Sequence, residues 1–393
     1  MSRKVVLTGN DAAAEAAALC RPDLVAAYPI TPQSKVVEHL AAMIYDGRLD
    51  STMIQVESEH SAMSAVQGAS AGGGRVFTAT SAQGLALMFE PYMRQATLRL
   101  PMVMALATRE MTSPETVWSG QQDAMSVREA GWMQVFCESN QEIIDMIIQG
   151  YMLAEDPRVL LPINVCYDGF YSSHLTEGAE LPDQEDVDAF LPHYSADWNP
   201  ILHPDKPLAL DPLTAGPLLM KYRESHLDAM ERALAVLEEV DAKFAAAFGR
   251  SYGGAIEEYR LDDADIVLIT IAGMSGTAKD AVDMAREKGV KAGLIRLRFT
   301  RPFPGKRIAK ALLGKKAFCA LDRSVSFGWS QGPMHVEVKA ALADQGASYC
   351  HFSAIGGLGG ADISLTEISG LIDELEAHKD EKGERPVRWL LKD

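Results

Sequence analysis

Residues 55–63 read Gln55-Val56-Glu57-Ser58-Glu59-His60-Ser61-Ala62-Met63, a stretch in which a strand gives way to a helix. A short buried strand is predicted to end at Val56, and a helix is predicted to begin at Ser58 or Glu59. Small or apolar residues recur there at near-helical spacing: Ala62, Met63, Ala65, Val66 and Ala69. A carboxylate in such surroundings is costly unless it meets a donor. The plainer alternative is that Glu57 and Glu59 only occupy the first helical turn, where the positive end of the helix dipole stabilises acidic side chains.

The composition predicts a soluble protein of two or three domains. The chain has 393 residues, of which 47% are hydrophobic and 23% charged, as in ordinary globular proteins. The longest apolar runs, such as 266–271, are too short to span a membrane, and the first residues lack a signal peptide's apolar region. We therefore expect a cytoplasmic protein. A net charge of -17 argues against binding to nucleic acid or to an anionic membrane.

The cysteine and histidine patterns predict no metal centre held by this chain alone. None of the cysteines forms a CxxC pair, which argues against an iron–sulfur cluster, structural zinc or a disulfide framework. The histidines show no HExxH or related spacing. The five cysteines are Cys20, Cys137, Cys166, Cys319 and Cys350.

The first half of the chain alternates strand and helix patterns, which predicts a parallel sheet covered on both faces. Asn10 is predicted to cap a helix that reaches about Cys20. Residues 81–84 are predicted to form a turn before a helix from Leu85. Together these patterns predict one α/β domain over residues 1–195. Its predicted strands are 4–7, 24–28, 53–56, 75–80, 100–107 and 159–165.

A change of composition separates this domain from a second one. Prolines punctuate 176–217, which predicts a strap over the surface. A bridging helix follows, with an apolar face, and 196–257 is predicted to be a linker. A smaller α/β domain is predicted for 258–393, with strands at 264–271, 290–297 and 316–322. The apolar face of the bridging helix carries Leu227, Met230, Leu234, Leu237, Val240 and Phe244.

Two polar residues lie at predicted carboxyl ends of strands, where open α/β sheets bind ligands. Thr31 follows the strand 24–28, and the alternative is that it caps the next helix. Arg109 follows the strand 100–107 and suits a substrate carboxylate, because a guanidinium donates two parallel hydrogen bonds. The alternative is an ordinary pair of Arg109 with Glu110 or Glu115. Asp123 and Arg128 are equally able to form a structural ion pair.

Two glycine-rich turns are the candidates for a nucleotide site. Residues 273–276 read Gly-Met-Ser-Gly after a strand, but the first glycine of the dinucleotide fingerprint is missing, and Arg296 and Arg298 stand where an acid is expected. The run 356–360 lacks a following P-loop lysine, so a plain turn is favoured. A dinucleotide-binding protein and a non-catalytic scaffold subunit remain alternatives from other classes.

Four motifs occur in order along the chain: Tyr28-Pro29-Ile30-Thr31-Pro32, Glu57-Ser58-Glu59-His60-Ser61-Ala62, Thr80-Ser81-Ala82-Gln83-Gly84-Leu85-Ala86-Leu87-Met88 and Asp168-Gly169-Phe170. Together they resemble landmarks of the alpha subunit of thiamine-diphosphate-dependent 2-oxoacid:acceptor oxidoreductases, the pyruvate:ferredoxin oxidoreductase family. The likeness covers nearly the whole chain, including 301–304 and 356–360. It implies a pyrimidine-type thiamine-diphosphate-binding domain followed by a transketolase-C-like α/β domain.

The resemblance also implies roles for individual residues. Glu59 would hydrogen-bond the aminopyrimidine ring nitrogen of thiamine diphosphate and favour its imino tautomer. Thr31 would hydrogen-bond the substrate, and Arg109 would hold the 2-oxoacid carboxylate. Further cofactor contacts are implied for Ser81, Gln83 and Gly84. The cofactor would be shared with a partner that supplies Mg²⁺ binding, and it would perform the electron-sink chemistry.

The resemblance implies a multisubunit enzyme that decarboxylates a 2-oxoacid oxidatively and transfers the acyl group to coenzyme A. Partners would be a diphosphate-binding beta subunit, a ferredoxin-like subunit with 4Fe-4S clusters and a gamma subunit. The stretch around Trp118, Gln122 and Asp123 departs from the pyruvate-oxidising members, which predicts an enlarged substrate pocket; the alternative is that the methionines and aromatic residues nearby are ordinary core. The sequence around Asn10, 28–34 and 121–142 is most similar to family members that oxidise phenylglyoxylate to benzoyl-CoA, which implies an FAD-containing partner as well. Pyruvate, giving acetyl-CoA, is the alternative substrate.

Overall fold

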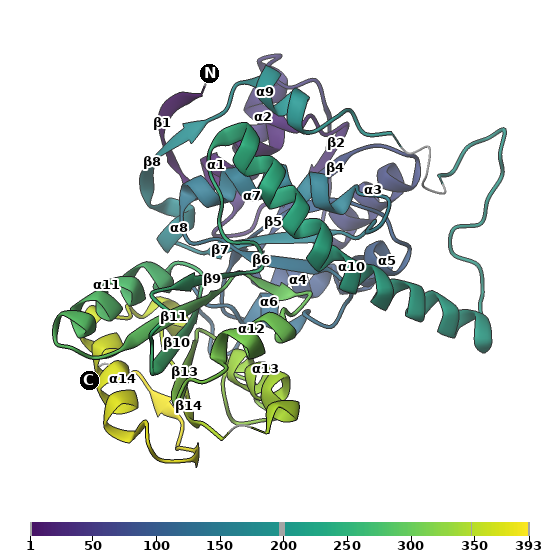
Figure 1. Cartoon of the computed structure of the whole chain (residues 1–393). Helices are drawn as coiled ribbons and strands as arrows, with labels where there is room; N and C mark the ends of the chain where they lie inside the picture. Colours follow the sequence, from purple (N-terminus) through teal and green to yellow (C-terminus); the bar gives the residue numbers. More distant parts are fainter. Residues whose placement is uncertain (1, 196–200, 347, 392–393) are drawn as a thin grey trace.

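The computed structural model describes residues 2–195, 201–346 and 348–391. Two seven-stranded sheets dominate it, one in each half of the molecule (Figure 1). The first sheet is parallel except for one edge strand. Its strand order is β12 (Phe299–Arg301), β6 (Met133–Phe136), β7 (Ile163–Asp168), β5 (Val103–Thr108), β4 (Val76–Thr80), β2 (Leu24–Ala27) and β3 (Thr52–Gln55).

Helices cover both faces of the first sheet, which confirms the predicted parallel α/β architecture. The central strands β4, β5 and β7 are buried at every residue, as expected for strands covered on both sides. One apolar cluster unites the sheet with α1 (Gly9–Leu19), α7 (Asn140–Ala154) and α10 (Pro217–Phe248). The other cluster includes α3 (Glu59–Ala71), α4 (Ala82–Leu87) and α5 (Phe89–Thr97), and it continues into the second half of the chain.

The second sheet is also parallel, except for its edge strand β9. Its order is β15 (Gly383–Glu384), β14 (Cys350–Ile355), β13 (Ala317–Asp322), β10 (Ile266–Ile271), β11 (Ala292–Leu297) and β9 (Ile256–Tyr259), with β16 (Arg388–Trp389) paired to β14. The predicted second α/β unit is therefore present. Its helices are α11 (Met274–Glu287), α12 (Gly305–Leu312), α13 (Pro333–Leu342) and α14 (Leu365–His378).

The two halves exchange contacts across the predicted boundaries. Strand β12 belongs to the second half by sequence, yet it pairs with β6 of the first sheet. Glu142 on α7 accepts hydrogen bonds from the buried Arg296 (2.6 Å) and Arg298 (2.7 Å). These ion pairs tie α7 to the end of β11. The division into 1–195, 196–257 and 258–393 remains a prediction, and residues 196–200 lie outside the described ranges.

Several local predictions near the N-terminus were wrong. The first strand forms as β1 (Arg3–Thr8), but it pairs antiparallel with β8 (Thr176–Leu181) in a separate sheet. Thr8, not Asn10, caps α1, because its hydroxyl accepts a hydrogen bond from the Asp11 N–H in a capping box. Asn10 is instead buried in α1, and its side chain donates to Pro32 O at 2.7 Å.

Other helices and strands begin at residues that differ from the predicted ones. Helix α4 begins at Ala82 with Ser81 as its N-cap, not at Leu85, so Gln83 and Gly84 lie in the first helical turn. Thr31 does not cap α2 (Ser34–Tyr45), because Gln33 occupies that position. The strand predicted at 159–165 is β7, four residues later at its start. The predicted strap is partly regular, since it contains β8 and α9 (Gln184–Phe190).

The long bridging helix is confirmed as α10, and Leu237, Val240 and Phe244 of its predicted apolar face are buried. Leu227 is exposed, whereas neighbouring small residues are buried because they pack on α7. Figure 1 shows the first turns of α10 projecting from the body of the molecule. Among the described residues, no helix is both long enough and apolar enough to cross a membrane. The buried residues of α10 are His226, Ala229, Ala233, Val236, Leu237, Val240, Asp241 and Phe244.

Candidate active site

Glu59 is the first residue of α3, as the sequence predicted. Ser58 caps the helix, and its hydroxyl accepts from the Ser61 N–H at 3.2 Å. The Glu59 side chain is 6% exposed, and within the described ranges its carboxylate accepts no hydrogen bond from another residue. A buried carboxylate without a donor is costly. The position therefore suits a carboxylate that receives its hydrogen-bond partner from a ligand.

The neighbours of Glu59 are arranged to leave room at its carboxylate. A Cβ built on Gly84 would lie 2.7 Å from Glu59 Oε1 and 2.5 Å from Thr80 Oγ1. Glycine is thus required for the close approach of α4 to the Glu59 side chain. The Thr80 hydroxyl and the Gln83 Oε1 are both buried without a hydrogen-bond partner among the described residues. The unpaired Thr80 hydroxyl close to an unpaired carboxylate indicates a site that is completed by a ligand.

Ser81 differs from these neighbours because its hydroxyl is already engaged. Its Oγ lies 2.8 Å from the Ala107 carbonyl oxygen and 2.8 Å from the Thr80 carbonyl oxygen. This side chain fastens the start of α4 to the end of β5. A direct contact of Ser81 with a cofactor remains a prediction.

Arg109 and Thr31 are brought together at the carboxyl edge of the first sheet. Arg109 Nη1 donates to the Thr31 carbonyl at 3.0 Å, and Nε donates to the Thr116 carbonyl at 3.0 Å. The side chain is 5% exposed, and burial lowers the pKa of its guanidinium. Nη2 donates to no other described residue. The alternative pairing with Glu110 or Glu115 is not among the ion pairs of the described residues.

Asp123 connects the helix α4, which lies against Glu59, with Arg109. It is fully buried, and its Oδ2 accepts from the main-chain N–H groups of Ala82 (2.9 Å) and Arg109 (3.0 Å). Burial raises the pKa of Asp123 to about 7, although these hydrogen bonds oppose the shift. The alternative ion pair with Arg128 is not formed, because Arg128 pairs with Glu337 at 3.1 Å.

The other two residues predicted for the substrate pocket face the second half of the chain. Gln122 Oε1 accepts from Ser324 Oγ at 2.8 Å and from the Val325 N–H at 3.2 Å. Trp118 is 51% exposed, and its ring centroid lies 4.4 Å from that of Phe170. Trp118 is thus the accessible member of the three, whereas Gln122 and Asp123 are engaged in protein contacts.

The Asp168-Gly169 pair holds the strand ends in place. A Cβ on Gly169 would lie 2.5 Å from the Thr108 carbonyl oxygen and 2.9 Å from Pro32. Asp168 Oδ2 accepts from the Gly273 N–H at 3.0 Å. The turn at 273–276, which has half of the dinucleotide fingerprint, therefore makes a contact between the two halves of the chain.

Sequence reasoning missed the roles of Thr80 and Asp123 in this arrangement. Thr80 stands at the carboxyl end of β4 next to the glycine-bearing α4 turn, and this position was a usable signal. Asp123 was predicted only as a residue of the substrate pocket, because its bonds to main-chain groups distant in sequence follow from no local pattern. Glu110 was considered only as a partner of Arg109. Burial and the nearby Asp123 charge raise its pKa to about 7.

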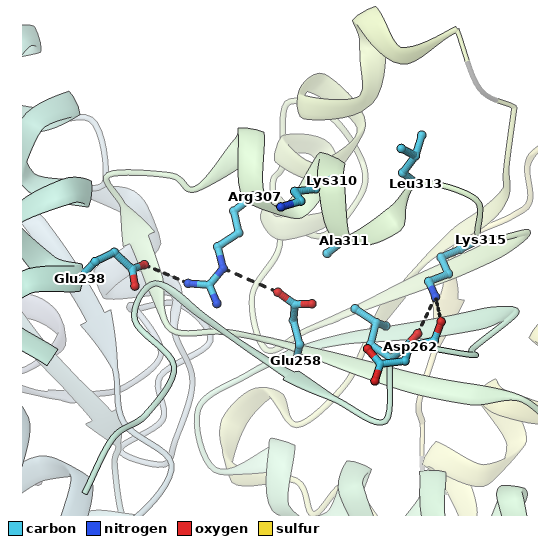
Figure 2. A pocket seen from close by; sticks show the side chains of 9 residues that line it. Glu238, Glu258, Asp262, Arg307, Lys310, Ala311, Leu313 and Lys315 are labelled. Atoms are coloured by element: carbon cyan, nitrogen blue, oxygen red, sulfur yellow. Dashed lines mark hydrogen bonds and ion pairs between the residues drawn. The ribbon is translucent and has the colours of Figure 1, made fainter. Parts of the chain in front are cut away.

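A cavity of about 600 Å³ lies elsewhere, against α10, β9 and α12 (Figure 2). Its charged lining is largely paired within the protein. Arg307 contacts Glu238 (3.0 Å) and Glu258 (3.7 Å), and Lys315 donates to main-chain oxygens of Leu261 and Asp262. None of the residues assembled around Glu59 lines this cavity, so it does not contribute to the candidate site.

Comparison with known proteins matches both halves of the chain. Residues 15–242 match the model described as pyruvate flavodoxin/ferredoxin oxidoreductase, thiamine diP-binding, and residues 264–368 match pyruvate:ferredoxin oxidoreductase core domain II. The NADH-dependent phenylglyoxylate dehydrogenase subunit alpha of Aromatoleum evansii is 48% identical over 382 residues, which cover 95% of this chain and 92% of that one. The pyruvate synthase subunit PorA of Methanothermobacter thermautotrophicus is 41% identical over 385 residues, covering 98% and 97%.

A solved structure has the same fold over most of the chain. It is a 2-oxoglutarate:ferredoxin oxidoreductase from Magnetococcus marinus with 2-oxoglutarate, coenzyme A and succinyl-CoA bound. The TM-score is 0.74 at 20% sequence identity, and the match covers 94% of this chain. The present chain spans 65% of the length of that solved chain.

Proposed function

The chain belongs to the pyruvate flavodoxin/ferredoxin oxidoreductase family, and from this premise we propose that it is the thiamine-diphosphate-binding alpha subunit of a 2-oxoacid oxidoreductase. The proposed reaction is the coenzyme A-dependent oxidative decarboxylation of a 2-oxoacid. The observation that carries the proposal is the buried Glu59 carboxylate, which has no donor among the described residues and lies against Gly84 and the unpaired Thr80 hydroxyl.

The residues around Glu59 fit the aminopyrimidine end of thiamine diphosphate. Such a ring offers the donors and acceptors that Glu59, Thr80 and Gln83 lack within the described structure. The carboxylate of Glu59 would hold the ring nitrogen and share a proton with it, and its buried setting strengthens that sharing. Gly84 supplies the space, and Ser81 anchors the helix that carries it. When bound, the cofactor supplies the carbanion and the electron sink.

Arg109 and Thr31 are proposed to receive the 2-oxoacid. Arg109 is oriented by two main-chain carbonyls, and its Nη2 is free of partners among the described residues. That leaves a charged donor for a substrate carboxylate. The Thr31 hydroxyl would donate to the adjacent oxo group. Asp123 acts as a positioning residue, because it holds the main chain at both Ala82 and Arg109.

The rest of the machinery is assigned to partner subunits. We assign Mg²⁺ and diphosphate binding to a beta subunit, and 4Fe-4S clusters to a ferredoxin-like subunit. The five cysteines of this chain are all buried, and the pKa values of Cys20, Cys137, Cys166, Cys319 and Cys350 are raised by burial. Buried thiols of raised pKa are poor ligands, because the thiolate is the species that binds metal. A gamma subunit and a flavin-containing subunit complete the proposed complex.

Phenylglyoxylate is the proposed substrate, and benzoyl-CoA is the product. The relative from Aromatoleum evansii, whose name specifies this substrate, is 48% identical to the chain. The exposed Trp118 ring beside Phe170 also offers an aromatic surface close to the Arg109 loop. Pyruvate is the second candidate, because the PorA subunit of pyruvate synthase is 41% identical over nearly the full length.

The test is a substrate panel on the purified native complex. Reduction of a viologen dye is followed with coenzyme A and either phenylglyoxylate, pyruvate or a branched-chain 2-oxoacid. We expect the highest kcat/KM for phenylglyoxylate. Preference for pyruvate would overturn the substrate assignment and leave the reaction class intact. Absence of turnover with every 2-oxoacid, in a complex that retains its cofactors, would contradict the proposed function.

A further inference from the structure

Three potential metal ligands converge at one edge of the second sheet, far from Glu59 in the fold. His335 lies on α13, His351 on β14 and Glu384 on β15. One ligand atom from each lies within 4.8 Å of the others. His351 and Glu384 are directly opposite on neighbouring parallel strands, so the pairing register itself sets them side by side. The helix α13 brings His335 to the same place.

The spacing of the two imidazoles suits a shared ion. His335 Nε2 and His351 Nδ1 are 3.2 Å apart. With metal–nitrogen bonds of about 2.0 Å, two ligands of a tetrahedral zinc ion are separated by roughly 3.3 Å. Without an ion, the same distance accommodates a hydrogen bond from one ring to the other. Metal binding replaces the proton of that hydrogen bond, so the imidazole that carries it has to change to its other tautomer.

The contacts of His335 leave its Nε2 lone pair available. Its Nδ1 lies 3.1 Å from Gln331 Oε1, and that oxygen also accepts from Lys339 Nζ at 3.2 Å. Gln331 Oε1 is therefore an acceptor, and His335 Nδ1 carries the proton. Metal-binding histidines are commonly oriented in this way by a second hydrogen bond.

The Lys339 ammonium opposes a cation at this cluster. Its ammonium contacts both Glu384 oxygens, at 3.0 and 2.9 Å, and the Gln331 amide also donates to Glu384. An incoming ion has to displace the ammonium from one of these oxygens, and the flexible lysine stem permits that movement. An open cavity of about 320 Å³ reaches the cluster, with Lys339, His351 and Glu384 in its lining. It provides an entry path and room for a water ligand.

We propose that His335, His351 and Glu384 bind one divalent transition-metal ion, with Zn²⁺ as the best-matched ion. Two imidazoles and a carboxylate form a donor set that zinc accepts readily, with a fourth position left for water. The ion would join α13 to the β14–β15 edge. The inference does not depend on oxoacid turnover, since it concerns a separate part of the chain.

The experiment uses the purified full chain, stripped with a chelator and titrated with Zn²⁺ by isothermal calorimetry. Bound metal is then counted by elemental analysis after desalting. The variants are His351→Gln, which removes a ligand, and Lys339→Met, which removes the competing charge. The matched control is His378→Gln, because His378 also pairs with a carboxylate, Glu381 at 2.7 Å, but belongs to no three-ligand group among the described residues. Circular dichroism checks that each variant is folded.

We expect one equivalent of Zn²⁺ to bind per chain in the wild type and in His378→Gln. We expect His351→Gln to retain no Zn²⁺ after desalting. Lys339→Met is expected to bind at least several-fold more tightly, because a like charge is removed. A further variant, Gln331→Ala, removes the hydrogen bond that orients His335 and is expected to weaken Zn²⁺ binding roughly 10- to 100-fold. The proposal is overturned if the wild type shows no saturable binding, or if a folded His351→Gln binds as the wild type does. If His351→Gln does not fold, unchanged or weaker binding by Lys339→Met overturns it.

Discussion

Arg109 and Thr31 are joined by a hydrogen bond of 3.0 Å from Arg109 Nη1 to the Thr31 carbonyl, although 78 positions separate them in the chain. The contact links the segments that follow β5 and β2, with β4 between them in the sheet. Asp123 in turn holds the Arg109 main chain and the first residue of α4. A continuous set of hydrogen bonds therefore connects Thr31 and Arg109, which are proposed to bind the substrate, with the helix α4 that lies against Glu59.

Glu59→Gln is expected to lower kcat by about 100-fold or more, since an amide does not share a proton as a carboxyl group does and a positioned acid–base group contributes about 10²–10⁴ in rate. Glu57→Gln is the control, because Glu57 is exposed and its carboxylate accepts a hydrogen bond from the nearby Ser61 hydroxyl. The measurement is dye reduction by the reconstituted complex. A near-wild-type rate for Glu59→Gln would favour the scaffold alternative.

Gly84→Ala is expected to weaken binding of thiamine diphosphate and to destabilise the chain by about 1–3 kcal/mol, because the new methyl group meets Glu59 and Thr80 at 2.7 and 2.5 Å. Gly68→Ala on α3 has open space around the added carbon and is expected to be neutral or slightly stabilising. Urea unfolding and cofactor titration report the two effects. Equal behaviour of the two variants would show that α4 does not approach Glu59 closely.

Arg109→Ala is expected to raise the KM for the 2-oxoacid by about 10- to 100-fold, because a hydrogen bond to a charged group contributes about 1.5–3 kcal/mol. The KM for coenzyme A is expected to stay constant. Arg48→Ala, at a half-exposed surface arginine, serves as the control. If Arg109→Ala lowers stability and leaves the oxoacid KM unchanged, the arginine has a structural role only.

The stability of the chain is expected to carry a contribution from Asp123 that is lost as the pH rises. Burial raises the pKa of Asp123 to about 7 from an ordinary value of 3.8, so the folded chain retains a proton that the unfolded chain releases. The contribution is fully present below about pH 4 and disappears as the pH passes 7. Asp123→Asn is expected to be less stable throughout, but to show a smaller decline of Tm between pH 4 and 7. An identical decline in both proteins would contradict the assignment.

Glu142→Gln is expected to destabilise the chain by about 3–5 kcal/mol, because it leaves the buried Arg296 and Arg298 without their shared carboxylate. The control is Glu239→Gln, which removes an exposed partner of Arg158 and is expected to leave the urea midpoint unchanged. Both variants are compared by urea unfolding. A small effect of Glu142→Gln would mean that Glu138 and Glu257, which also contact Arg296, replace it.

Much of the fold was predictable because it is encoded locally. The apolar runs at β5, β7, β10 and β13 have the length and continuity of strands buried on both faces. The start of α3 followed from a capping serine before small residues at helical spacing. Errors arose where two local signals competed, as at Thr8 and Asn10, since either side chain is able to cap a helix. Tertiary contact decided that case, because Asn10 is used to hold Pro32.

The sequence by itself determined the two α/β units, the position of Glu59 at a helix start and the family to which the motifs belong. Only the tertiary structure decided which side chains meet: Arg109 with Thr31, Asp123 with Ala82, and β12 with β6 across the predicted domain boundary. The same holds for His335, His351 and Glu384, which follow no metal-binding spacing. The physical reason is that periodicity and capping record interactions within a few residues, whereas these contacts join distant segments and depend on strand order and helix packing.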